Sequence, residues 1–208
     1  MKSLINLDDF ELFDSVIFFD LEFTCWEDNN IINNWQDALR PPEIIQMGFA
    51  CYDKSNHQIK NVFSSYVKPN VNPVLSSYCK KLLSIDNDLI KNSPKLIDVV
   101  IKLSNWLDQI PENYVFSSWG VEDYLIMADD CDRSNIPNPL KNIDYIDLMR
   151  ISHKMIGIDN FKYFDREEVK KYLKIYKKDH SHEALKDAID LKSILAGLQN
   201  KFQKSISA

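Results

Sequence analysis

Hydrophobic residues occur first in short runs along the chain and later in stripes with helical spacing. Residues 16–22 open with apolar side chains on both faces, which is typical of a buried central strand. Residues 44–52 and 58–67 predict two further strands joined by a short polar turn. Shorter strands are expected at 114–118 and 143–147. Three predicted strands therefore come before the first long helix, and two follow it.

Helices are expected between and after these strands. The clearest spans residues 94–110, where apolar residues recur at helical spacing behind Pro94. The other predicted helices are 76–83, 122–130, 148–156, 166–176 and 183–199. The polar, Asn-rich residues 28–42 predict a long loop. This order of elements predicts an α/β domain, with a mixed five-stranded sheet flanked by helices on both sides.

Composition excludes several functional classes. The chain has 208 residues, 45% of them hydrophobic, which suits one globular domain. Its four glycines are far apart, so it lacks the glycine-rich dinucleotide loop, the P-loop and the G-x-S-x-G elbow. The four cysteines form no C-x-x-C pair, which disfavours a structural zinc site. The N-terminal segment is acidic and no apolar run approaches a membrane span, so we expect a cytoplasmic protein with reduced thiols and no membrane partner.

The charge distribution is uneven. A net charge of −6 argues against bulk nucleic-acid binding, but residues 162–178 hold seven basic residues and three acids. Most basic residues are lysines, which attract phosphates as point charges, so any nucleic-acid contact is expected along the backbone. One face of a predicted helix carries four lysines, Lys170, Lys174, Lys177 and Lys178. That face is either a simple solvated surface or a guide for a single strand.

The first candidate for chemistry lies at the end of the central strand. Asp20 and Glu22 point to the same face, because side chains alternate along a strand. A solvent-facing strand end is the simpler interpretation of such a pair. The buried apolar run just before it favours carboxylates that border a crevice, where ligand sites of α/β sheets lie.

The second candidate lies in the last helix. Asp187 falls within the apolar stripe formed by Ala184 and Leu191, so its carboxylate faces the protein and needs either a metal ion or a salt bridge to a lysine. His182 lies about 140° away on an ideal helix. We therefore expect His182 in the turn before the helix, where it can lean over the same site; a helix cap or a surface position is the alternative.

The third candidate follows the strand at 114–118, where Glu122 and Asp123 open a helix. Either acid can simply favour the helix dipole, and both compete for a role in a site. Together the three segments offer four carboxylates and one histidine, more than a salt bridge needs. Such hard oxygen donors suit Mg²⁺ or Mn²⁺. Two such ions ~4 Å apart can clamp the attacking and leaving oxygens of a phosphodiester, with histidine as proton acceptor.

The motifs FDLEFTC, SWGVED and HEALKD resemble those of the DEDDh branch of the DnaQ-like 3′-to-5′ exonucleases. This resemblance implies a ribonuclease-H-like fold, two divalent cations and a histidine general base. The implied metal ligands are Asp20, Glu22, Asp123 and Asp187, and the implied base is His182. The sister branch has a tyrosine where this chain has Glu183, and is disfavoured.

Two further segments narrow the resemblance. The stretch FSSYVKPNVNPVLSSYCKKLLSID is similar to one in the Eri-type exoribonucleases and the KapD-like proteins, and PPEIIQMG fits the same group. The chain departs from this group at Leu83 and Ser84, which replace a usual Thr-Gly, and in a less basic histidine motif. The similarity covers residues 15–198, so residues 1–208 are expected to form a single exonuclease domain.

The resemblance implies hydrolysis of single-stranded RNA or 3′ overhangs to nucleoside 5′-monophosphates, with RNA favoured over DNA as partner. The candidate substrate contacts are Phe23, Thr24, Trp26 and Trp119. Aromatic rings there can stack on terminal bases, although a core position is the alternative, above all for Trp119. Two other functions stay open: a KapD-like regulatory protein that inhibits a signalling pathway, and a DNA-directed exonuclease.

Overall fold

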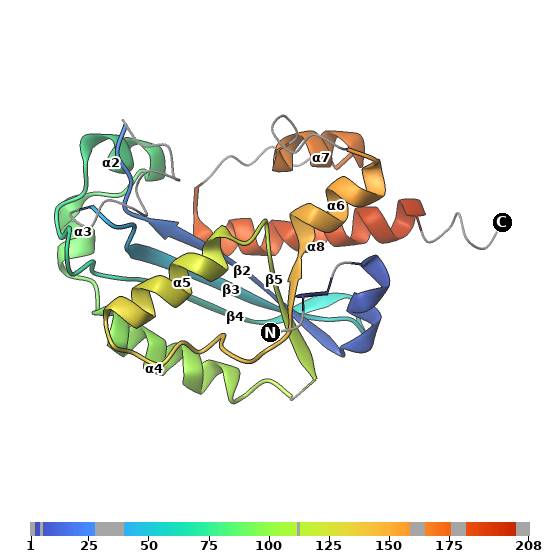
Figure 1. The fold of residues 1–208 in the computed structure, drawn as a ribbon, viewed down its shortest axis with the longest axis horizontal. Coiled ribbons are helices and arrows are strands. Elements are labelled where there is room, and N and C mark those ends of the chain that lie inside the picture. Colours follow the sequence, from blue (N-terminus) through green and yellow to red (C-terminus); the bar gives the residue numbers. More distant parts are fainter. Residues whose placement is uncertain are drawn as a thin grey trace.

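A six-stranded mixed sheet organises the protein (Figure 1). The computed structural model describes residues 3–4, 6–27, 40–111, 113–158, 165–175 and 182–202. In spatial order the strands are β1 (Ser3–Leu4), β6 (Tyr145–Asp147), β5 (Tyr114–Ser118), β2 (Ser15–Phe23), β3 (Ile44–Asp53) and β4 (Gln58–Tyr66). Strand β3 is antiparallel to β2 and β4, and the other pairs are parallel. All five predicted strands are present, and the two-residue β1 adds a sixth.

The six predicted helices are also present, five of them with shifted ends. The helical elements are η1 (Leu7–Leu12), α2 (Ser77–Leu83), α3 (Asn87–Lys91), α4 (Leu96–Leu107), α5 (Glu122–Arg133), α6 (Leu148–Ile156), α7 (Arg166–Tyr172) and α8 (Ala184–Phe202). Elements η1 and α3 were not predicted, because five or six residues are too few to show a helical period. Helix α7 ends before residue 176, since Lys174 adopts a left-handed conformation (φ 59°). No helix within the described ranges is both long and apolar enough to cross a membrane.

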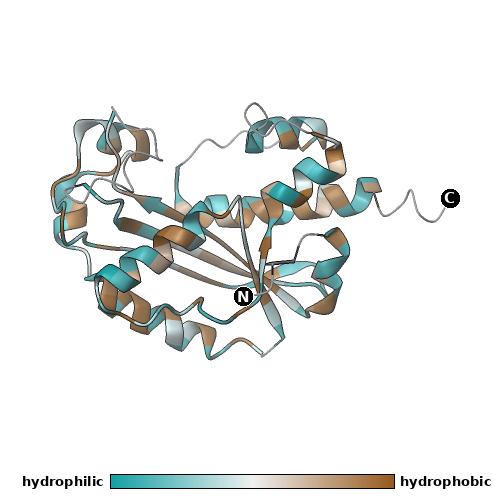
Figure 2. Cartoon of the chain, in the orientation of Figure 1, coloured by the Kyte–Doolittle hydropathy of each residue, from teal (hydrophilic) through white to brown (hydrophobic). Residues whose placement is uncertain are grey.

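Alternate side chains of β2 serve two separate cores, one on each face of the sheet. Ile17 and Phe19 pack with residues of α4 and α5, whereas Val16 and Phe18 pack with residues of α6 and α8. Figure 2 shows hydrophobic residues along the central strands and mixed colouring along the helices. Burial of each large apolar side chain contributes roughly 1.5–3 kcal/mol. The central strand is therefore held from both sides, and its carboxyl end is a rigid platform.

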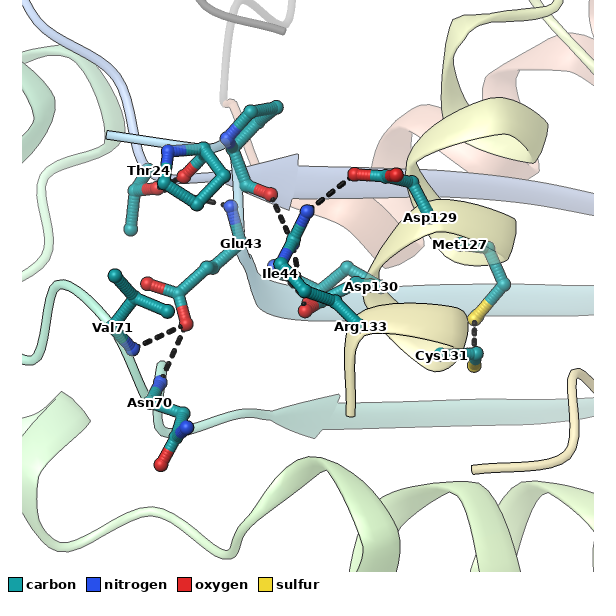
Figure 3. A network of polar contacts seen from close by, with 12 residues as sticks. Thr24, Glu43, Ile44, Asn70, Val71, Met127, Asp129, Asp130, Cys131 and Arg133 are labelled. Atoms are coloured by element: carbon teal, nitrogen blue, oxygen red, sulfur yellow. Dashed lines mark hydrogen bonds and ion pairs between the residues drawn. The ribbon is translucent and has the colours of Figure 1, made fainter. Parts of the chain in front are cut away.

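A buried glutamate ties together the segments around this platform (Figure 3). The Glu43 carboxylate accepts hydrogen bonds from the backbone N–H groups of Asn70, Val71 and Asn72 at 2.6–2.7 Å. The Glu43 N–H in turn donates to the Thr24 hydroxyl at 3.0 Å. The residues after β2, before β3 and after β4 are thus held to one another by charge-assisted bonds.

A second acid anchors the end of α5 to the same region (Figure 3). The Asp130 carboxylate accepts from the Ile44 N–H at 2.9 Å and pairs with the Arg133 guanidinium at 2.9 Å. Arg133 also donates to the Pro42 carbonyl at 2.8 Å. Burial raises the pKa of Asp130, while the Ile44 N–H and Arg133 oppose that rise. Helix α5 is thereby fixed against the start of β3.

Candidate active site

Asp20 and Glu22 project together from the end of β2, on the face that packs against α8. In the sheet they lie opposite Gly48 and Gln46 of β3. Burial raises the pKa of Glu22 to about 9, with the nearby carboxylates of Asp20 and Asp187 adding to the rise. Burial also raises the pKa of Asp20, with the same repulsion from Asp187. The two groups therefore stand in a desolvated, electronegative environment that favours binding of a cation.

Asp123 joins this cluster from the first turn of α5. Its carboxylate accepts a hydrogen bond from the Leu21 N–H of β2 at 3.3 Å, and the residue is only 8% exposed. Burial and the nearby Asp20 raise the pKa of Asp123 well above its usual range. Glu122, the competing acid in the sequence, lies exposed. Of these two neighbours, Asp123 lies against the strand that carries the first acids.

The first turn of α8 and the residues just before it bring the last two predicted residues to the site. Asp187 is 7% exposed, and His182 lies exposed in the segment just before the helix, as the 3.6-residue period requires. Burial raises the pKa of Asp187, and the guanidinium of Arg166 opposes that rise. One ligand atom from each of Glu22, His182 and Asp187 lies within 4.8 Å of the others.

Two residues of β3 set the position of α8. The Ala184 N–H, at the start of α8, donates to the side-chain oxygen of Gln46 at 3.3 Å. A Cβ on Gly48 would lie only 2.2 Å from the Ala184 carbonyl carbon and the Leu185 nitrogen, so the two backbones are in direct contact. Sequence reasoning did not assign Gln46 and Gly48 to the site. A glycine inside a predicted strand was the available signal, because it often marks a close backbone approach.

A cation from α7 also enters the site, and sequence reasoning missed it. The Arg166 guanidinium lies 2.9 Å from Asp187 Oδ1 and 3.8 Å from Asp20 Oδ1. The sequence left a metal ion and a lysine salt bridge open for Asp187, and its ion-pair partner is this arginine. The only signal for it was its place in the basic segment 162–178.

The sequence left open that the lysine face of α7 is a solvated surface, and at Lys170 this interpretation is wrong. Its side chain is 3% exposed and forms ion pairs with Glu167 at 3.0 Å and Asp190 at 2.7 Å. Packing of α7 against α8 buries Lys170, which the amphipathic pattern alone does not reveal, whereas Lys174 lies exposed beyond the end of α7. Residues 177 and 178, which continued the basic run, lie outside the described residues.

The candidate substrate residues Phe23, Thr24 and Trp26 follow the two strand acids. Phe23 is partly buried against the core of α4 and α5. The Thr24 hydroxyl is buried, accepts from the Glu43 N–H and lies 3.5 Å from the Pro41 carbonyl. Trp26 is partly exposed. Of the three, the two aromatic rings keep exposed surface near the strand end, whereas the threonine hydroxyl serves the fold.

Trp119 lies at the junction between β5 and α5. Its ring packs edge-on against His153, with 6.3 Å between ring centroids, and contacts the core of α6 and α8. The next residue, Gly120, has φ +83°, a conformation that side-chain-bearing residues rarely adopt. This tight turn directs the chain from β5 into α5, and so places Asp123 over β2.

The donor set fits divalent cations such as Mg²⁺ or Mn²⁺. It consists of carboxylate oxygens, which these hard ions prefer. In addition to burial, the charge of Asp20 raises the pKa of both Glu22 and Asp123, and the charge of Asp187 raises that of Asp20; a cation relieves this repulsion. The arrangement can therefore hold metal ions beside an exposed imidazole.

A comparison with protein families decides the family. The RNase_T model, described as exonuclease, matches residues 17–195. The chain belongs to this exonuclease family. The match starts within β2 and ends within α8, so it includes all the acids described above.

Curated relatives of this exonuclease family member include two that carry the names of nucleases. The chain is 27% identical over 164 residues to "ERI1 exoribonuclease 2" of Danio rerio, an alignment that covers 69% of this chain and 28% of the relative. It is 31% identical over 128 residues to "Probable 3'-5' exonuclease KapD" of Bacillus subtilis, covering 61% of this chain and 58% of the relative. The chain thus aligns with only part of each relative.

A solved structure shows the same fold. The nuclease domain of 3'hExo, described as a DEDDh family member bound to rAMP, has a TM-score of 0.77 with this protein. The two are 20% identical, and the alignment covers 91% of this chain and 94% of the other. The expected ribonuclease-H-like exonuclease fold, with a mixed sheet between helices, is confirmed.

Proposed function

We propose that this exonuclease family member is a metal-dependent 3′-to-5′ exonuclease, with residues 15–198 as a single catalytic domain. The observation that carries the proposal is the convergence of four carboxylates and one imidazole at the end of β2. They come from three separate segments, and the residues are Asp20, Glu22, Asp123, Asp187 and His182. The names of the exoribonuclease and KapD relatives support the same activity.

In the proposed reaction, the four carboxylates hold two divalent cations, which when bound stabilise charge on the scissile phosphate and activate water. The His182 ring nitrogen accepts a proton from the attacking water. Its exposed position allows that proton to exchange with solvent. The water oxygen bonds to phosphorus, the P–O3′ bond breaks, and the leaving 3′ oxygen takes up a proton. The products are a shortened strand and a nucleoside 5′-monophosphate.

The chain itself supplies orientation. The Leu21 N–H fixes Asp123 by a hydrogen bond. The Gln46 side chain bonds to the start of α8, and Gly48, which has no side chain, lets the α8 backbone approach β3 closely. Carboxylates held in this way keep their positions when the cations bind, so little reorganisation accompanies the reaction. Phe23 and Trp26 are the proposed stacking surfaces for terminal bases.

We propose single-stranded RNA, or a 3′ overhang, as the substrate, with DNA as the alternative. Support comes from a relative named exoribonuclease and from a fold neighbour described as bound to rAMP. A protein that acts on both nucleic acids would lack a contact specific to the 2′-hydroxyl.

The test uses 5′-labelled RNA and DNA strands of one sequence, incubated with Mg²⁺ or Mn²⁺. Asp20→Asn, Asp123→Asn and His182→Ala should each lower the rate at least about 100-fold. Glu122→Gln is the matched control, because it changes an exposed neighbour of Asp123 and should keep the wild-type rate. Equal cleavage by the wild type and the three site variants would refute the proposal. Faster cleavage of DNA than RNA would refute the RNA preference alone.

The KapD-like regulatory function predicts a different result in cells. A protein that acts only by binding a partner should keep its cellular effect in Asp187→Asn. An exonuclease should lose that effect, because Asp187 is a proposed metal ligand.

A further inference from the structure

Arg166 lies among the carboxylates of the proposed metal site. Its guanidinium contacts Asp187 at 2.9 Å and stands 3.8 Å from Asp20, and its side chain is 23% exposed. The charges of Asp187 and Asp20 raise the pKa of Arg166 despite its burial. No other lysine or arginine among the described residues forms an ion pair with either of these two acids. In this structure the arginine is therefore the counter-ion of two residues that are proposed to bind metal.

The helix that carries Arg166 is firmly attached to α8. Val169 of α7 is fully buried in the core of α6 and α8. Lys170, one turn after Arg166, pairs with Asp190 of α8 at 2.7 Å, and Asp190 lies three residues after Asp187. Two ion pairs thus link matching faces of α7 and α8. The backbone at Arg166 is fixed, and only its long side chain is free to change partner.

Metal binding and the Arg166–Asp187 pair compete for the same carboxylate. The Oδ1 atom of Asp187, which accepts the hydrogen bond from the guanidinium, can pair closely with only one cation at a time. A divalent ion bound nearby also repels the guanidinium. A guanidinium displaced from Asp187 still needs an anionic partner, because an unpaired charge in this half-buried position is costly. The anion that the reaction brings to the site is the phosphodiester. The planar guanidinium fork binds phosphate with the same two-point geometry as carboxylate.

We propose that Arg166 is a substrate-binding residue of this site, which neutralises Asp20 and Asp187 before the cations bind and then holds the phosphate of the bound nucleotide. This inference rests on the proposed function above. The alternative is a purely structural ion pair between α7 and α8. If the ion pair is only structural, replacing Arg166 changes the stability of the protein alone. If Arg166 exchanges partners as proposed, replacing it strengthens metal binding and weakens phosphate binding.

The experiment compares R166Q and R166K with the wild-type chain. The matched control is K171Q, which removes one positive charge from the same helix at an exposed ion pair with Glu168. Thermal unfolding is followed during titration with Mn²⁺, starting from chelator-treated protein. Adenosine 5′-monophosphate and adenosine are then titrated calorimetrically at saturating Mn²⁺.

R166Q should lower the Mn²⁺ concentration for half-maximal stabilisation about tenfold, because the ion no longer displaces a guanidinium. It should weaken binding of the monophosphate about tenfold and leave adenosine unchanged, since only the phosphate contact is lost. R166K should keep the wild-type Mn²⁺ midpoint and still weaken monophosphate binding, because lysine keeps the charge without the fork. K171Q should match the wild type in both titrations.

An unchanged or higher Mn²⁺ midpoint in R166Q would overturn the inference, as would an unchanged affinity for the monophosphate. If R166Q does not fold, wild-type monophosphate affinity in R166K would overturn it. Absence of any Mn²⁺ effect on the wild type would instead refute the proposed function. The two failures are therefore distinguishable.

Discussion

Replacing Gly48 with alanine would test how the candidate site is assembled. Gly48 lies in β3 directly opposite Asp20, and it faces the first turn of α8. An alanine Cβ would stand 2.2 Å from the Ala184 carbonyl carbon and from the Leu185 nitrogen. Both are backbone atoms, so no side-chain rotation can relieve the clash.

The size of the displacement follows from these contacts. Ordinary van der Waals contact of a Cβ begins at 3.4 Å, so β3 and the start of α8 must separate by more than 1 Å. His182 and Asp187 flank this turn and must move with it. A 1 Å misplacement of reacting groups costs about 100-fold in rate. Forcing an extra methyl group into such a contact costs roughly 1–3 kcal/mol of stability.

The assay measures kcat/KM on 5′-labelled RNA together with urea unfolding at the same temperature. Gly197→Ala is the matched control, because it adds the same methyl group to α8 far from the first turn. There the Cβ meets side-chain atoms of Ile175 and Leu173 at 3.1 Å, and these can shift. Alanine also gains up to about 1 kcal/mol over glycine within a helix. We expect near-wild-type activity for the control and a loss of about 100-fold for Gly48→Ala.

Wild-type activity and stability in Gly48→Ala would refute this reasoning. That result would mean that the backbone contact between β3 and α8 does not position the acid and the histidine. A loss of stability with full activity would show that α8 keeps its place while another part of the sheet yields.

Three further predictions concern buried charges. Glu43→Gln should lower the free energy of unfolding by about 2 kcal/mol in urea, because an amide replaces a carboxylate that accepts three backbone N–H groups; an unchanged value would contradict this. Lys170→Met should lower the free energy of unfolding by about 3 kcal/mol, because it leaves Asp190 unpaired. The double variant with Asp190→Leu should regain most of that stability, and additive losses would disprove the pairing. Binding of Mn²⁺ should release protons at pH 7, because the pKa of Glu22 is raised to about 9 and its carboxyl must ionise to bind the ion. Calorimetry in buffers of different ionisation enthalpy measures this proton release, and a pH-independent Mn²⁺ affinity would contradict it. Because the Glu22 pKa rises from 4.5 on folding, the metal-free protein should also lose stability as the pH rises towards 9. Unfolding at several pH values checks the sign of this second effect.

Local periodicity was enough to predict much of this protein. Side-chain alternation along β2 requires Asp20 and Glu22 to share a face, and the helical period requires Asp187 to point inward while His182 stays outside the helix. All of these directions are relative to the element that carries the residue. They depend on backbone geometry alone, so a single sequence contains them.

Tertiary packing decided which groups meet. Glu122 and Asp123 are equivalent acids in the sequence, and only the contact between α5 and β2 buries the second. The partner of Asp187 is Arg166, and Lys170 is buried rather than solvated, because α7 packs on α8. Each of these contacts joins elements whose relative placement depends on the whole core. A local pattern specifies the direction of a side chain, but the atom it meets is determined only when the elements pack together.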